Sequence, residues 1–189
     1  MAGAIGLERI LRRLKPEKHI QRAPRSAASL PFVDSEPLAG PPLLLDTCVY
    51  VHVLKGKTPA RVDELLSART IYHSGTAIGE LVHRLGSRVP SNAKEKRAHQ
   101  VLMETIKDIP AHRTVSPIAQ IWAEAGILAG IRARTGGFQT QPQDALNDAL
   151  IFLQAREVGA VVLTANIADF DIFQQIVPNG RLIFYRATS

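Results

Sequence analysis

The chain has little of what would place a protein outside the cell or in a membrane. It contains one cysteine, Cys48, which excludes an intrachain disulfide and a metal site built from several thiolates. No apolar run approaches the roughly 20 residues that a membrane-spanning helix needs. The start of the chain also lacks the basic and apolar regions of a signal peptide. We therefore expect a cytoplasmic protein with no membrane partner.

The sequence also lacks a histidine metal-binding motif and an internal repeat, which narrows the classes of protein it can belong to. The histidines are scattered, without an HExxH pair or similar ligand spacing, and there is no internal repeat. With 189 residues, 46% of them hydrophobic and 21% charged, the composition is typical of a soluble globular chain with a real core. The net charge of +6 and a pI near 9.8 favour a polyanionic partner.

Residues 1–41 differ in composition from the rest and are interpreted as a basic N-terminal extension and linker. Residues 1–40 hold seven Lys or Arg against four Asp or Glu. A weak amphipathic pattern predicts a helix over residues 5–14, and the Pro- and Ser-rich stretch 16–42 is typical of a linker. We expect a loose tail, with an arm that binds nucleic acid or a partner as the alternative. Residues 42–189 are predicted to form the folded domain.

In residues 42–189, short apolar segments alternate with amphipathic helical patterns. Strands are expected at 43–46, 70–74, 114–115, 160–163 and 181–185. Helices are expected between them, with Thr76, Ser116 and Asp144 as N-caps and with Ile118 and Trp122 packed inward. This alternation predicts an α/β fold whose central, mostly parallel sheet is covered by helices on both faces.

Four acids lie just after predicted strands or near the starts of predicted helices. Asp46 follows the first strand, Glu80 and Asp148 lie early in helices, and Asp169 follows a late strand. If right-handed crossovers stack the strands side by side, all four approach one edge of the sheet. Clustered carboxylates repel one another, and a hard divalent cation removes that conflict. The pattern therefore suits a Mg²⁺ or Mn²⁺ site that hydrolyses phosphodiester bonds.

Each acid also has a simpler explanation when it is taken alone. Asp46 could cap the following helix, Glu80 could complement a helix dipole, and Asp169 could be a loop acid. Cys48 has no evident activating partner and is interpreted as a small buried apolar residue. A phosphatase of the haloacid dehalogenase type needs a second Asp two residues after the first, and Cys48 stands there instead.

With these residues assembled, the sequence resembles the PIN-domain family, and within it the VapC-type toxins of bacterial toxin–antitoxin pairs. The matching segments are LLLDTCVYV (43–51), GELVHRL (79–85), NDALIFLQAREVGAVVLTAN (147–166) and DF (169–170). The resemblance implies a PIN-like three-layer α/β/α fold and a Mg²⁺- or Mn²⁺-dependent ribonuclease with a clustered acidic site.

The resemblance also assigns residues. Asp46 matches the family's first acid, Glu80 its second and Asp148 its third. Asp169 is taken as the fourth catalytic and metal-binding acid, with the alternative that the fourth place falls on Asn166, where many relatives have Asp. Cys48 stands where Asn or Ser is frequent, which predicts that a supporting hydrogen bond near Asp46 is missing.

The function that follows is a metal-dependent endoribonuclease, the toxin of a type II toxin–antitoxin pair. Its expected partners are RNA, a cognate antitoxin and a second copy of the chain, with Arg84 and Arg88 contacting the RNA backbone. The alternative is a catalytically inactive PIN module that binds RNA or a protein. A further hypothesis has the basic extension folding over the acidic groove, so that its deletion raises activity.

Overall fold

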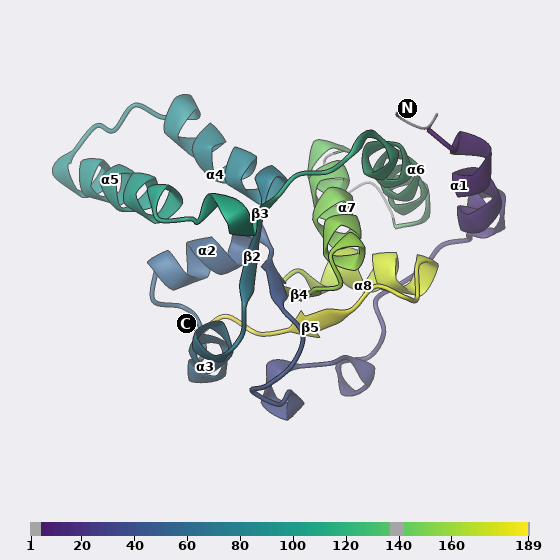
Figure 1. Ribbon diagram of the computed structural model, residues 1–189, viewed down its shortest axis with the longest axis horizontal. Coiled ribbons are helices and arrows are strands. Elements are labelled where there is room, and N and C mark those ends of the chain that lie inside the picture. The colour runs from purple at the N-terminus through teal and green to yellow at the C-terminus, as the bar shows by residue number, and fades with distance from the viewer. Residues whose placement is uncertain (1–4, 137–141, 189) are drawn as a thin grey trace.

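The centre of the computed structural model, which describes residues 5–136 and 142–188, is a five-stranded sheet (Figure 1). Its strands are β1 (Leu43–Leu45), β2 (Ile71–Ser74), β3 (Thr114–Val115), β4 (Val161–Thr164) and β5 (Leu182–Phe184). Their order is β3-β2-β1-β4-β5, and the described pairings are all parallel. The predicted α/β fold with a parallel central sheet is confirmed.

The middle strand, β1, explains why the sequence has three consecutive leucines. Leu43 and Leu44 are fully buried, and Leu44 is in register with Tyr72 of β2 and Val162 of β4. A central strand of a parallel sheet has helices on both faces, so neighbouring side chains on both sides must be apolar. The chain runs from β1 to β2 on one side and returns with β4 on the other. The carboxyl ends of β1 and β4 therefore flank the point where ligands bind in open α/β sheets.

Helices cover both faces of this sheet (Figure 1). Figure 1 shows α2 and α3 on one side of the sheet and α6, α7 and α8 on the other, while α4 and α5 form a pair that projects away. The helices are α1 (Leu7–Leu14), α2 (Thr47–Leu54), α3 (Ala60–Ala68), α4 (Gly75–Ser87), α5 (Ala93–Lys107), α6 (Ala119–Thr135), α7 (Pro142–Glu157) and α8 (Ile167–Ile176). No described helix is both long and apolar enough to cross a membrane.

Three of the predicted helix starts are wrong in detail. The cap of α4 is Ser74 rather than Thr76, because β2 leads straight into the helix and the Ser74 hydroxyl accepts from the Thr76 amide at 3.1 Å. Ser116 precedes a proline, which disfavours helical backbone, and α6 begins only at Ala119 without a side-chain cap. Asp144 is not a cap either, since α7 begins with Pro142 and Asp144 lies in its first turn.

The extension is folded onto the domain, so the interpretation as a loose tail is wrong for residues 5–41. Helix α1 packs against α6, and Phe32 forms a bridge with Phe184 at the free edge of β5. The Phe184 amide donates to the Pro31 carbonyl at 2.8 Å, which satisfies part of that edge. Its buried apolar residues join the core: Ile10, Leu14, Leu30 and Val33. The division into an extension and a PIN domain stays a prediction.

Candidate functional site

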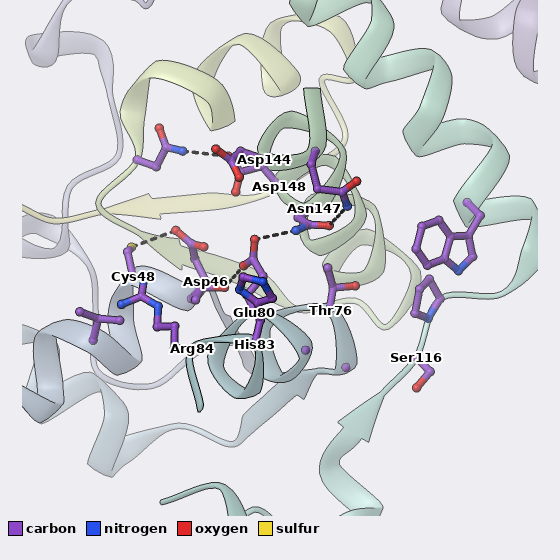
Figure 2. A pocket seen from close by; sticks show the side chains of 18 of the residues that line it. Asp46, Cys48, Thr76, Glu80, His83, Arg84, Ser116, Asp144, Asn147 and Asp148 are labelled. Atoms are coloured by element: carbon purple, nitrogen blue, oxygen red, sulfur yellow. Dashed lines mark hydrogen bonds between the residues drawn. The ribbon is translucent and has the colours of Figure 1, made fainter. Parts of the chain in front are cut away.

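A cleft of about 1010 Å³ opens at the carboxyl ends of β1 and β4. Its lining comes from the start of α2, from α4, from the segment that joins β3 to α6, and from the start of α7. Figure 2 shows Asp46, Glu80 and Asp148 pointing into this space from three different elements. The first cleft-lining residue along the chain is Asp46. The described part of the extension therefore does not cover the acids, and the hypothesis that it folds over the groove is wrong.

Asp46 lies at the N-cap position of α2, but its side chain does not cap the helix. Its Oδ2 atom instead accepts hydrogen bonds from the Thr164 hydroxyl at 2.6 Å and from the Cys48 thiol at 2.9 Å. Asp46 is only 3% exposed, and this burial raises the pKa of its carboxyl group above the ordinary value. The two donors oppose that rise because they stabilise the charged form. The explanation of Asp46 as a simple cap therefore fails.

Cys48 supplies the hydrogen bond that the sequence predicted to be missing, so that expectation is wrong. Burial, followed by the charge of Asp46, raises the pKa of the thiol far above its usual range. The thiol therefore remains protonated and donates to Asp46, while the Ala165 amide donates to Sγ at 3.3 Å. Behind it, the Tyr185 hydroxyl lies 3.8 Å from Sγ and 2.7 Å from Nδ1 of His52. Cys48 is thus a polar support for Asp46, rather than only an apolar filler.

Glu80 reaches the cleft from the second turn of α4. The Thr47 hydroxyl donates to its Oε2, and Asn147 Nδ2 donates to its Oε1 at 2.7 Å. Figure 2 shows the contact between Asn147 and Glu80 as a dashed line. The two contacts tie α4 to the starts of α2 and α7, which explains how a residue 34 positions after Asp46 comes to face the same space. The simpler explanation of Glu80, that it complements the helix dipole, does not account for these two partners.

Asp148 also has a raised pKa in this site. Burial raises the pKa of its carboxyl group to about 9, and the neighbouring charges of Asp46, Asp169, Glu80 and Asp144 add to the rise. Its Oδ2 accepts one hydrogen bond, from Asn166 Nδ2 at 2.9 Å. At neutral pH this carboxyl group therefore holds a proton in the structure as it stands.

Asp169 lies behind this cluster and does not line the cleft. Its Oδ1 accepts from Nε of Arg132 at 2.8 Å, and its Oδ2 accepts from Asn166 Nδ2 at 3.1 Å. Asn166 therefore bridges Asp169 and Asp148 with one amide group. The structure brings Asp46, Glu80 and Asp148 together at the cleft. Asp169 lies farther from the cleft, behind Asn166, and is paired with Arg132.

Comparison with known proteins gives structural matches only. No protein-family model and no curated protein matches the chain. A chain of VapBC2 from Rickettsia felis, solved with a promoter DNA fragment, is 19% identical and superposes with a TM-score of 0.54 over 77% of this chain and 99% of its own. FitAcB from Neisseria gonorrhoeae (24%, TM-score 0.53) covers 76% of this chain and 96% of its own. VapBC-1 from nontypeable Haemophilus influenzae (18%, TM-score 0.52) covers 75% and 96%.

The fold is that of a PIN domain. At these identities the likeness concerns the fold, and the predicted resemblance is confirmed at that level. The cleft lies where the strands β1 and β4 end, which is where ligands bind in open α/β sheets.

Ion pairing separates the acids that line the cleft from the buried acids elsewhere in the fold. The buried acids elsewhere each contact arginine within 2.8 Å: Glu124 with Arg13 and Arg156, Asp169 with Arg132, and Asp171 with Arg25. Within residues 5–136 and 142–188, Asp46, Glu80 and Asp148 form no such pair. The cleft therefore gathers acidic side chains that no described basic side chain pairs with.

The donor set fits a hard divalent cation in its chemistry, although the side chains are not yet arranged around one. Asp46, Glu80 and Asp148 offer carboxylate oxygens, the ligands that Mg²⁺ and Mn²⁺ prefer. In the described part of the chain, no three His, Cys, Asp or Glu side chains already form a group that could hold a metal ion. Their oxygens instead contact other side chains: Glu80 accepts from Thr47 and Asn147, and Asp148 accepts from Asn166.

Several cleft residues were not predicted. Asn147 supports Glu80, and its place directly before Asp148 was the available signal. Trp122 was expected to pack inward but is 48% exposed and lines the cleft, and Ile118 is 57% exposed. Of the two arginines predicted to contact RNA, Arg84 lines the cleft and Arg88 does not.

Proposed function

We propose that this PIN domain is a divalent-metal-dependent endoribonuclease. One observation supports it most: Asp46, Glu80 and Asp148 come from three elements, share one cleft, and have no ion-pair partner among the described residues. Such clustering of like charges costs stability in the isolated protein. A divalent cation bound between the carboxylates and a phosphodiester would offset this repulsion and make the cluster a metal-binding site.

The three carboxylates would hold the ion. Mg²⁺ or Mn²⁺, when bound, would lower the pKa of the attacking water and stabilise the charge that develops on the leaving oxygen. On Asp46 both side-chain donors, Thr164 and Cys48, approach Oδ2 and fix the carboxyl group at the cleft. The Thr47 hydroxyl and the Asn147 amide hold Glu80 at the edge of the cleft. Asp148 must lose its proton to ligate, which makes metal binding stronger as the pH rises toward about 9.

Asp169, predicted as the fourth ligand, is proposed to act through Asn166. Arg132 fixes Asp169, Asp169 fixes the Asn166 amide, and that amide contacts Asp148. This chain of contacts makes Asp169 and Asn166 positioning residues for the third acid. Removing a partner of a metal ligand typically costs about 10- to 100-fold in affinity or activity.

The RNA specificity in the proposal rests on the resemblance of the sequence to VapC-type ribonucleases. Arg84 and His83, both on α4 and both lining the cleft, would contact phosphates next to the cleaved one. Binding through Arg84 should weaken as the salt concentration rises, because each phosphate contact releases counterions.

We further propose a toxin role in the cytoplasm, with a cognate antitoxin and a homodimer as its assembly partners. This part rests on the same resemblance and on the structural likeness to chains of VapBC and FitAcB assemblies. Co-expression with the protein of the adjacent reading frame, followed by co-purification, tests it.

The central experiment compares RNA cleavage by the wild type, Asp46→Asn and Asp34→Asn in Mn²⁺. We expect Asp46→Asn to lose more than about 100-fold in rate, since it alters a metal ligand rather than one of that ligand's supporting partners. Asp34 is an exposed acid of the extension, and its variant should cleave normally. Cleavage that persists in Asp46→Asn, or in wild type treated with a chelator, would rule out the metal–acid site.

A second candidate is a PIN module that binds RNA or protein without cleaving. It is favoured by the observation that the described residues do not form a preassembled metal group. Thermal unfolding with Mn²⁺ separates the two functions. A ligand at 100 times its Kd stabilises the native state by about 2.7 kcal/mol, so a nuclease site should raise the Tm and an inactive module should not respond.

A further inference from the structure

One wall of the cleft carries a feature that the metal site does not use. Trp122, the only tryptophan of the chain, lies in the first turns of α6 and is 48% exposed while it lines the cleft. Ser116 and Pro117 line the same side, and Figure 2 shows Ser116 well away from Asp46 and Asp148. The cleft therefore extends beyond the acids to an exposed indole.

The part of the cleft wall that α4 contributes next to Ser116 is made of small residues. Gly75, Thr76 and Gly79 of α4 line it, and a Cβ atom added at Gly79 would meet nothing within 4 Å. Open space thus continues into the cleft beside Gly79. A volume of about 1010 Å³ also exceeds what one phosphate and a metal ion occupy, and lies at the upper end of the roughly 300–1,000 Å³ of small-molecule sites.

We propose that Trp122 is a stacking platform for an unpaired base of the RNA strand whose phosphodiester lies at the acids. An aromatic face accepts any base, and it can do so only when the base is not paired within a duplex. The cleft provides one group for each part of a nucleotide strand: carboxylates for a cation at the cleaved phosphate, Arg84 for a neighbouring phosphate, and the indole for a base.

This proposal rests on the proposed function and names its substrate class: single-stranded RNA. The cleft favours a strand of RNA because Arg84, the acids and the indole line the same space, which suits a chain that carries both phosphates and bases. The platform would also exclude regular duplexes, because their bases are already stacked.

The single tryptophan allows a direct test. All tryptophan fluorescence comes from Trp122, so binding of a ten-nucleotide single-stranded RNA to the Asp148→Asn protein, used to prevent turnover, should change that signal. The same RNA annealed to its complement should not. In this background Trp122→Ala should weaken binding of the single strand about tenfold, and Trp122→Phe should weaken it less, because a ring remains.

Ile118→Ala is the matched control, since Ile118 is exposed one turn earlier on the same side of the chain but does not line the cleft. It should bind RNA like its parent. An oligonucleotide without a base at the stacked position should bind the Trp122 and Trp122→Ala proteins equally. RNA bound with unchanged fluorescence, or equal affinity in Trp122→Ala, would overturn the proposal and leave Trp122 to a protein contact.

Failure of the platform and failure of the nuclease function are distinguishable. Binding is measured without turnover, so a stacking signal together with wild-type cleavage in Asp46→Asn would reject the metal mechanism and keep the platform. Metal-dependent cleavage without any stacking signal would reject the platform and keep the metal mechanism.

Discussion

Two groups of acids in this protein have opposite surroundings. Near α6 and α8, Glu124, Asp169 and Asp171 each contact an arginine. Glu124 is almost fully buried, yet the hydrogen bonds and charges of its arginines outweigh burial and lower the pKa of its carboxyl group. In the cleft, burial and like charges raise the pKa of Asp148 to about 9.

The difference teaches that burial alone does not make an acid functional. The same side-chain type stabilises the fold where an arginine meets it and destabilises the fold where other acids meet it. Proteins keep such local conflicts mainly at functional sites. The cleft is the candidate site because its acids form no ion pair with a described residue, and the extension contributes to the opposite group through Arg13 and Arg25.

The largest effect on stability is expected from breaking a compensated pair. Arg25 donates to Asp171, which is 0% exposed, through its backbone amide at 2.7 Å and its Nε at 2.8 Å. Arg25→Ala leaves a buried carboxylate without its charged partner, and breaking such a pair costs about 3 kcal/mol in the free energy of unfolding. Urea denaturation of the variant and the wild type measures this loss.

A double variant sharpens this test. In Arg25→Ala/Asp171→Asn no buried charge remains, so part of the lost stability should return. If Arg25→Ala unfolds at the wild-type urea concentration, then Asp171 is not held by the extension as the structure shows.

In the cleft, replacing an acid is expected to increase the free energy of unfolding instead of lowering it. Asp148→Asn removes a carboxyl group that the folded state disfavours as an anion, and it should stabilise the metal-free protein by about 2 kcal/mol at neutral pH. Between the unfolded pKa of about 3.9 and the folded pKa of about 9, the native state holds a proton that the unfolded state has released. Wild-type stability therefore falls as the pH rises through this window. The Tm advantage of Asp148→Asn should grow from pH 5 to pH 9 and then level off.

Asp144→Asn is the matched control for this prediction. Asp144 is exposed in the first turn of α7, where an acid complements the helix dipole, so its removal should cost a few tenths of a kcal/mol and show no such growth with pH. A Tm advantage of Asp148→Asn that does not change with pH would contradict the raised pKa.

The smallest effect concerns the support of Asp46. Cys48→Ala removes the thiol that donates at 2.9 Å, and loss of one hydrogen bond costs about 1 kcal/mol. It should also lower Mn²⁺ affinity about tenfold, as other losses of a ligand's partner do. Cys48→Ser keeps a donor and should retain most of the affinity in calorimetric titration. Equal Mn²⁺ affinity in Cys48→Ala and wild type would show that the thiol does not position Asp46.

Much of the fold and of the cleft could be predicted from short sequence patterns. The run Leu43–Leu45 indicated a buried central strand because both of its faces must be apolar. Asp46 and Asp148 stood at the ends or starts of elements, where the topology of a parallel sheet places ligands. Helix starts were less predictable, because at Ser116 the restriction by Pro117 overrode the capping preference.

The sequence by itself determined the order of strands and helices along the chain, the resemblance to a PIN domain, and three of the acids that line the cleft: Asp46, Glu80 and Asp148. The tertiary structure decided which acids are compensated. Arg25 and Asp171 are 146 residues apart, and Arg132 and Asp169 are 37 apart, so only packing brings these pairs together. It also decided that Cys48 is a donor, that α1 packs against α6, and that Phe32 bridges to the edge strand β5. The physical reason is the same in each case: periodicity records which face of an element is apolar, but not which polar group lies across from it.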